Sequence, residues 1–168
     1  RKFINTYPNN LKLLQQYTWT LSFFEESALN EAKQLINMHP EFENDPLLKL
    51  VQARIALKSS DMETAYNKYC DCIHDWCDSP VFWCGLGVLY FKNDQFQDAL
   101  IAFQRALYQK AEIAEAWLNI GYIFESMKNQ PNAIKIYEAG LKNCQNDQKL
   151  ADRLNRLKGQ GRGAQQLA

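Results

Sequence analysis

Four residues with metal-ligating side chains lie close together in the chain, where Cys70, Cys72, His74 and Cys77 form the pattern C-x-C-x-H-x2-C. Thiolates and imidazoles are ligands that zinc prefers, so the pattern first suggests a zinc site. On a helix, however, residues 70, 74 and 77 share one face while Cys72 points away from it. Structural zinc sites normally combine a turn with a second element. We therefore predict that these four are ordinary helix residues and that the chain holds neither a metal nor a cofactor.

The remaining candidate residues do not indicate catalysis. His39 precedes Pro40 in an expected turn, and His74 belongs to the cysteine cluster. Serine, cysteine, histidine and the acids show no spacing that would bring a nucleophile and a base together. Gly85 and Gly87 do not form a nucleotide-binding loop, because they lie within an expected helix that no strand precedes. We therefore predict that the protein is not an enzyme.

The composition is that of a chain able to build a core, with 46% hydrophobic and 23% charged residues. Lys and Arg together number 19, as do Asp and Glu, so no overall field draws the chain to nucleic acid or to an anionic membrane. The longest apolar stretch, Val81 to Phe91, is too short to span a bilayer and contains two glycines. Five cysteines at irregular spacing favour reduced thiols inside the cell over a secreted disulfide framework.

A repeat with an offset of 34 residues organises the chain, as the pair Trp83 and Trp117 shows. The same offset relates further large and small residues: Leu86 to Ile120, Gly87 to Gly121, Tyr90 to Phe124, Ala99 to Ala133, Phe103 to Tyr137 and Ala106 to Gly140. We interpret each repeat as an antiparallel helix pair. One pair alone cannot bury its apolar face, so successive pairs must stack. The small residues allow close helix contacts, and the aromatic residues fill the gaps beside them.

The offset sets the predicted boundaries. Complete repeats are expected at 80–113 and 114–147, and degenerate repeats at 9–42 and 46–79. Residues 43–45 break the register between the two degenerate copies. Together these repeats predict an all-α chain.

The two ends of the array differ from the repeats. Residues 1–8 are expected to close a preceding helix, which would make the chain part of a longer array. Leu150, Leu154 and Leu157 give residues 148–158 one apolar side, so this segment is predicted to be a helix that caps the last pair. Residues 159–168 show no periodicity and are predicted to be a flexible tail.

The recurring Trp, Leu-Gly and Tyr of the first helix, followed by Ala, an aromatic residue and Ala on the second, resemble the tetratricopeptide repeat (TPR) consensus. This resemblance implies a right-handed superhelical solenoid of antiparallel helix pairs with a C-terminal capping helix. The segments FWCGLGVLY, AWLNIGYIFE and NQPNAIKIY make residues 80–158 similar to the TPR domains of the UTX/UTY histone demethylases and the fungal Ssn–Tup corepressor. The N-terminal half departs from that pattern.

The resemblance implies a nuclear scaffold that docks regulators of chromatin or transcription, as a subunit of a larger complex. No catalytic domain of a demethylase is present in the sequence, so no activity is carried over. A cytoplasmic or ciliary location belongs to the rival interpretation, a TPR subunit of a large structural or trafficking assembly of the ciliary-transport or ubiquitin-ligase type. A third interpretation is an enzyme such as a glycosyltransferase whose catalytic domain lies outside this sequence.

The first helices of such repeats line a concave groove, and helical phase predicts which side chains face it. A largely apolar strip of this extent favours a groove that binds an apolar helix or an extended peptide of another protein. For any single side chain, packing against a neighbouring helix of the same chain is the alternative. The expected groove residues are Leu13, Tyr17, Leu47, Leu50, Arg54, Leu57, Val81, Cys84, Val88, Phe91, Glu115, Leu118, Tyr122 and Glu125.

One familiar use of TPR grooves is not expected here. Co-chaperone repeats hold a terminal carboxylate with cationic and amide side chains, which form charge-assisted hydrogen bonds. The matching positions of this chain carry Leu50, Val81, Cys84 and Gly85, which cannot form such bonds.

Overall fold

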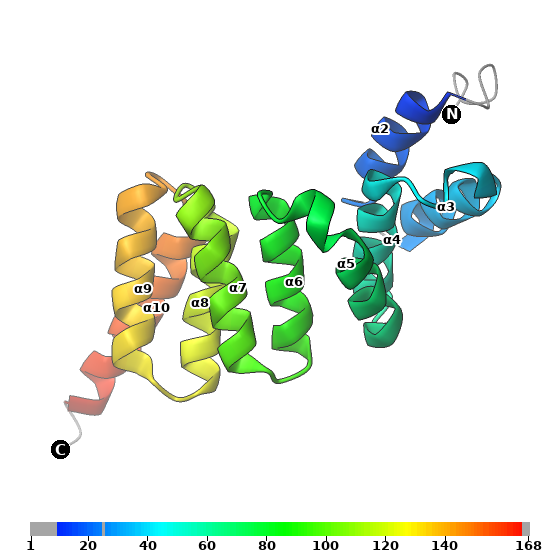
Figure 1. Ribbon diagram of the computed structural model, residues 1–168. Helices are drawn as coiled ribbons and strands as arrows, with labels where there is room; N and C mark the ends of the chain where they lie inside the picture. Colours follow the sequence, from blue (N-terminus) through cyan, green and yellow to red (C-terminus); the bar gives the residue numbers. More distant parts are fainter. Residues whose placement is uncertain (1–9, 25, 166–168) are drawn as a thin grey trace. The chain divides into compact units, whose positions relative to one another are not determined.

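The computed structural model describes residues 10–24 and 26–165, with the backbone alone for residues 160–165. Within these ranges every regular element is a helix, as the all-α prediction requires (Figure 1). The chain divides after Cys77 into two compact units, unit 1 up to Cys77 and unit 2 from Asp78 onward. The elements are α2 (Leu11–Leu21), α3 (Glu26–Asn37), the 3₁₀ helix η1 (Pro40–Phe42), α4 (Pro46–Lys58), α5 (Met62–Trp76), α6 (Pro80–Lys92), α7 (Phe96–Gln109), α8 (Ala114–Ser126), α9 (Gln130–Asn143) and α10 (Gln148–Gln165).

Unit 1 contains two helix pairs, α2 with α3 and α4 with α5. Leu14 of α2, Ala32 of α3 and Val51 of α4 belong to one buried cluster, so the second pair packs on the first. Trp76, at the end of α5, donates from Nε1 to the carbonyl oxygen of Pro46 at the start of α4, 3.1 Å away. This bond joins opposite ends of the two helices, as an antiparallel pair requires. The turn that follows the 3₁₀ helix η1 occupies the predicted break in register at 43–45.

Unit 2 contains the pairs α6 with α7 and α8 with α9, followed by α10. Helices α6 and α7 approach closely because Gly87 has no side chain: a β-carbon there would lie 2.8 Å from Cε1 of Phe103. At Gly121 of α8 an added β-carbon would collide with the ring of Tyr137 of α9. The glycines therefore fix the spacing within each pair, as the sequence predicted.

The turns inside three helix pairs repeat the same backbone geometry. Ser60, Asp94 and Lys128 adopt left-handed φ values of 61°, 58° and 57°. In each turn the next residue donates its backbone N–H to a carbonyl near the end of the preceding helix, at 2.9, 2.9 and 2.8 Å. This bonding satisfies a carbonyl group that the helix itself leaves unpaired. The three positions are separated by the 34-residue offset seen in the sequence.

Five of the described helices are capped at their start by a short polar side chain. Asp45, for example, accepts from the N–H of Leu48 at 2.9 Å, and Asp147 accepts from that of Leu150 at 2.9 Å. Ser79 stands at the cap position before Pro80, but its side chain forms no capping bond. The other side-chain caps are Asn10, Asp61 and Asn129.

The last helix is longer than the sequence predicted. As expected, Leu150, Leu154 and Leu157 are buried, in a cluster with residues of α8 and α9. The prediction of a flexible tail from residue 159 is wrong for residues 159–165, whose backbone continues α10. The physical reason is that each residue added to an existing helix gains a hydrogen bond without a new nucleation cost. The predicted helix end at 1–8 and the final residues 166–168 lie outside the described residues.

Among the residues described, none of the helices combines the length and the apolar content needed to cross a bilayer.

Candidate partner-binding faces

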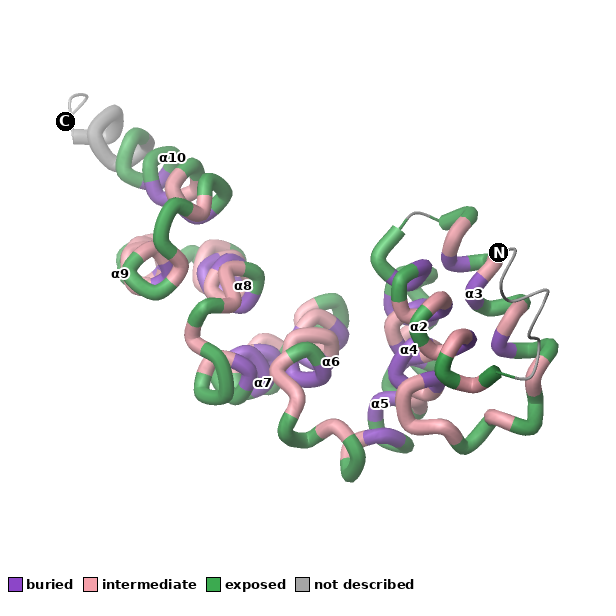
Figure 2. The backbone as a smooth tube through the Cα atoms, turned by 90° about the horizontal axis from the view of Figure 1, so that it is seen from above, coloured by how far each residue is buried: buried purple, intermediate pink, exposed green. Residues whose placement is uncertain are grey.

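Helix α6 of unit 2 buries one side and leaves the other accessible. Phe82 and Leu89 are fully buried, whereas Val81 is 38% exposed. The other predicted groove residues of this helix are half-buried, and all four follow helical spacing along one side. We call this set the α6 stripe: Val81, Cys84, Val88 and Phe91. In Figure 2 each helix of unit 2 with described side chains likewise carries both buried and exposed positions.

The α6 stripe is held in place from beneath by the core of unit 2. Cys84, Val88 and Phe91 pack against the buried cluster that contains Phe103 and Ile120. Phe91 also contacts the ring of Phe96 on α7, with centroids 5.9 Å apart. The inner atoms of these side chains are thus fixed while their outer atoms remain accessible.

The predicted positions on α8 have a different character. Glu115 is exposed, and Tyr122 and Glu125 are half-buried. Leu118 is only 6% exposed and belongs to the cluster formed with α9 and α10, so it is a core residue and not a groove residue. Helical phase alone could not predict the burial of Leu118, because this burial depends on where α10 packs.

A polar network joins α8, α9 and α10 beside these positions. The hydroxyl of Tyr137 donates a short hydrogen bond to Oε1 of Glu125. Nε of Arg153 lies 3.5 Å from the same oxygen, and the Arg153 guanidinium lies 4.5 Å from the centre of the Tyr122 ring. Sequence reasoning missed Arg153 and Tyr137, since a helix period cannot show which polar groups meet across three helices.

Burial and charge set the protonation of two groups in unit 2. Burial, with the nearby carboxylate of Glu115, raises the pKa of the Cys84 thiol to about 12. Cys84 therefore presents a neutral, weakly polar surface at physiological pH. Burial, followed by the bond to Glu125, raises the pKa of Tyr137 above its ordinary value, so this hydroxyl keeps its proton and remains a donor.

Unit 1 uses most of its predicted groove residues internally. Leu50 and Leu57 are 1% and 7% exposed, so they are core residues, contrary to the prediction. The reason is that α4 is apolar on nearly every side, and helical phase cannot separate a buried side from an accessible one in such a helix. The Tyr17 hydroxyl donates to Glu31 of α3 at 3.1 Å. Only Leu13 and Leu47 remain as half-buried apolar positions of the predicted set in this unit.

Arg54 of α4 is also held by its own unit. Its guanidinium carbon lies 4.3 Å from the ring centre of Phe23 and 5.0 Å from that of Trp19. Its Nε donates to Oγ of Ser22 at 3.2 Å. Burial lowers the pKa of Arg54 from its ordinary value, but an arginine stays charged at physiological pH. Arg54 thus ties α4 to the end of α2.

Cys70, Cys72 and His74 of the cysteine cluster lie on α5, and Cys77 directly follows the end of this helix. Cys72 is fully buried, whereas Cys70, His74 and Cys77 are exposed, which matches the predicted difference in direction. Burial raises the pKa of Cys72 to about 11, so it is a neutral core thiol. In the described part of the chain no three or more His, Cys, Asp or Glu side chains are placed to hold a metal ion. Elsewhere, His39 bonds to Glu41 through Nδ1 at 2.9 Å in the turn before α4.

The small residues that pack against aromatic rings in unit 2 lie in segments that match a known protein family. The model for the tetratricopeptide repeat matches residues 81–112 and 114–147. These two segments are thus similar to tetratricopeptide repeats. They correspond to the pairs α6 with α7 and α8 with α9.

Solved structures show the same TPR fold over more of the chain. A thermophilic TPR protein of Thermus thermophilus aligns with a TM-score of 0.75 and 14% identity, covering 92% of this chain and 84% of that one. MamA aligns with a TM-score of 0.68 and 17% identity, covering 89% of this chain and 82% of that chain. A chain of the APC/C hetero-tetramer Cut9–Hcn1 gives a TM-score of 0.68 at 22% identity, covering 78% of this chain and 27% of its own. At these identities the likeness concerns the fold.

A curated relative is the PEX5-related protein of Rattus norvegicus, which is 26% identical over 132 residues. The match covers 72% of this chain and 22% of the relative. The chain therefore spans less than a quarter of the length of that protein.

Proposed function

We propose that this chain is a non-catalytic scaffold that binds other proteins, and that the α6 stripe together with the neighbouring surface of α8 forms its partner-binding face. The expected ligand is an amphipathic helix or an extended peptide with apolar side chains. The support for a scaffold is the presence of two tetratricopeptide repeats, a module used for protein–protein binding.

The observation that carries the proposal is the accessibility of the α6 stripe. Helix α6 is apolar on almost every side, yet unit 2 closes only part of it, and Val81 remains 38% exposed. Accessible apolar surface beside polar groups is typical of an interaction site. On α8 the exposed carboxylate of Glu115 lies at the edge of this apolar surface and suits a basic residue beside the apolar side chains of the ligand.

The second part of the proposal concerns the kind of complex to which this scaffold belongs. The similarity of residues 80–158 to the UTX/UTY and Ssn–Tup domains supports a subunit of a nuclear complex that regulates chromatin or transcription. The alternative is a subunit of a large structural or trafficking assembly. A neighbour within an APC/C hetero-tetramer and a PEX5-related relative are compatible with that alternative. Chromatin fractionation of the tagged endogenous protein separates the two, because only the first predicts enrichment with chromatin.

The binding face is tested by Val81→Glu, with Ile101→Glu as the matched control. Both positions are exposed, at 38% and 52%, and Ile101 lies on α7, outside the α6 stripe. A carboxylate in the first turn of α6 is favourable for the helix, so Val81→Glu should fold normally. We expect quantitative co-purification from native cells to lose a defined set of partners with Val81→Glu and to keep them with Ile101→Glu. Retention of every partner by Val81→Glu would overturn the proposed face.

A further inference from the structure

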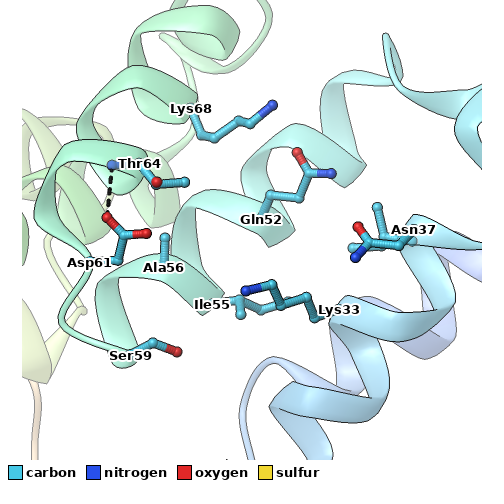
Figure 3. A pocket seen from close by; sticks show the side chains of 10 residues that line it. Lys33, Asn37, Gln52, Ile55, Ala56, Ser59, Asp61, Thr64 and Lys68 are labelled. Atoms are coloured by element: carbon cyan, nitrogen blue, oxygen red, sulfur yellow. Dashed lines mark hydrogen bonds between the residues drawn. The ribbon is translucent and has the colours of Figure 1, made fainter.

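A hollow of about 280 Å³ lies in unit 1 among α3, α4 and α5 (Figure 3). Its floor is apolar, with Ile36 and Ile55 among the lining residues, while its sides carry polar and charged groups. A water molecule occupies about 30 Å³ in the liquid, so the hollow has room for a side chain of several heavy atoms. It lies within unit 1 alone and shares no residue with the α6 stripe.

Two lysines give the hollow a positive character. Lys33 enters from α3 and Lys68 from α5, so the ammonium groups reach it from different helices. Within the described residues neither ammonium group is engaged in a salt bridge. Their charges are therefore available to an anionic group placed between the two helices.

An amide oxygen in the same hollow has no hydrogen-bond donor among the described residues. This atom, Oε1 of Gln52, is buried. Figure 3 shows the Gln52 amide projecting from α4 between Lys68 and Asn37. A buried acceptor without a donor costs free energy, so an incoming N–H group would be favourable there.

The one acid in the lining does not cancel the lysines. Asp61 caps α5, accepting the backbone N–H of Thr64 at 3.1 Å. Bonds to Thr64, with a weaker contribution from Lys33, lower the pKa of Asp61. The carboxylate of Asp61 is therefore engaged in capping α5. With two lysines and one aspartate among the lining residues, the net charge of the hollow is positive.

We propose that this hollow binds an aspartate or glutamate residue from an extended segment of a partner protein. The acidic side chain enters between Lys33 and Lys68, and a backbone N–H of the partner donates to Gln52. A carboxylate supplies acceptors for the ammonium groups, and the adjoining peptide supplies the donor that Gln52 lacks. The site is independent of the partner-binding face on α6, so either proposal can fail without the other.

The test uses the whole chain and a defined probe, acetyl-Gly-Gly-Glu-Gly-Gly-amide, at millimolar concentration. Methyl NMR signals of Ile36 and Ile55 report on the floor of the hollow. We expect the probe to shift these signals, and the same peptide with Gln in place of Glu to leave them unchanged. Added salt should weaken the effect, because part of the attraction is between charges.

Variants assign the effect to the hollow. Lys33→Gln and Lys68→Gln should each weaken probe binding about fivefold, the usual upper range for one partly exposed charge. Lys12→Gln, an exposed lysine on α2 that does not line the hollow, should bind as the parent chain does. Gln52→Leu should raise the melting temperature, since it removes an unsatisfied buried acceptor, and should weaken binding of the probe.

Three results would overturn the proposal. Equal shifts with the Glu and Gln peptides would show that no anion is recognised. Unchanged binding in both lysine variants, or no shift of Ile36 and Ile55, would place any binding elsewhere. A response to inorganic phosphate without a response to the Glu peptide would show that the hollow selects phosphate and not carboxylate.

Discussion

At Gly121, helix α8 lies so close to α9 that any side chain would meet the ring of Tyr137. That ring cannot easily move away, because Tyr137 is fully buried and its hydroxyl is bonded to Glu125. A single hydrogen in place of a methyl group thus sets the spacing of this helix pair. Gly159 on α10 is the opposite case, since an added β-carbon would meet nothing within 4 Å.

The contrast between these glycines gives a prediction. Gly121→Ala should lower the free energy of unfolding by about 1–3 kcal/mol, because overpacking outweighs the better helix propensity of alanine. Gly159→Ala should raise it by up to about 1 kcal/mol, because only the propensity changes. Urea unfolding followed by circular dichroism measures both. Equal effects of the two changes would contradict the close contact.

The hydroxyl of Tyr137 should make stability depend on alkaline pH. Its pKa is raised above the ordinary value of 10.0 by burial and by the bond to Glu125. The stabilisation from the protonated hydroxyl is therefore complete below pH 10 and is lost as pH rises above it. Tyr137→Phe should cost about 1.5–3 kcal/mol at pH 7, the usual loss of a hydrogen bond to a charged group.

The measurement for Tyr137 is a comparison of unfolding free energies at neutral and alkaline pH. Effects of alkaline pH on the rest of the chain contribute equally to the parent chain and to Tyr137→Phe. The difference between the two chains should shrink as pH rises beyond 10. A constant difference would show that Tyr137 has an ordinary pKa.

Among the elements, the turns between paired helices share a backbone conformation that is unfavourable for residues other than glycine. Ser60, Asp94 and Lys128 all adopt positive φ, a conformation that glycine adopts without steric cost. Lysine has no local hydrogen bond to compensate, in contrast to aspartate, which tolerates this region better. The chain therefore carries strain in a turn that closes α8 onto α9.

Lys128→Gly should relieve this strain and raise the free energy of unfolding by about 1 kcal/mol. Lys135→Gly is the matched control, because Lys135 is exposed within α9 and glycine there costs about 1 kcal/mol. Thermal unfolding should move in opposite directions for the two variants. A loss of stability in both would mean that the turn does not store strain.

At the scale of the whole molecule, the contacts within each unit follow the order of the chain. In unit 1, α4 packs on α2 and α3 as well as on α5. In unit 2, α8 packs on α6 and α7 as well as on α9, and α10 packs on α9 and α8. In such arrays stability is a sum of repeat terms and nearest-neighbour terms. A defect at one end should therefore fade along the chain.

Leu150→Ala tests this view, because Leu150 is fully buried in the cluster of α8, α9 and α10. We expect a loss of about 2–4 kcal/mol in the stability of these helices, from lost burial and the cavity left behind. Hydrogen exchange should quicken in α8, α9 and α10 and change least in α2 and α3. An equal change throughout the chain would show that it unfolds as one cooperative unit.

The sequence by itself determined the helix pairs, because the 34-residue offset and the alternation of glycine, alanine and aromatic residues reflect contacts that are local in the chain. Gly87 against Phe103 and Gly121 against Tyr137 are contacts inside one pair. The buried side of the capping helix followed from its leucine spacing in the same way. The direction of Cys72, away from the other members of its cluster, also needed only a helix period.

Only the tertiary structure decided which predicted groove residues reach the surface. Leu50 and Leu118 occupy the repeat position of Cys84, and Leu57 occupies that of Phe91, yet these three leucines are buried. The Arg153–Glu125–Tyr137 network and the hollow around Gln52 likewise join helices that are separate in the sequence. A period specifies the direction of a side chain from its own helix. What covers that side chain depends on where another helix docks, so the α6 stripe could be distinguished from the core only in three dimensions.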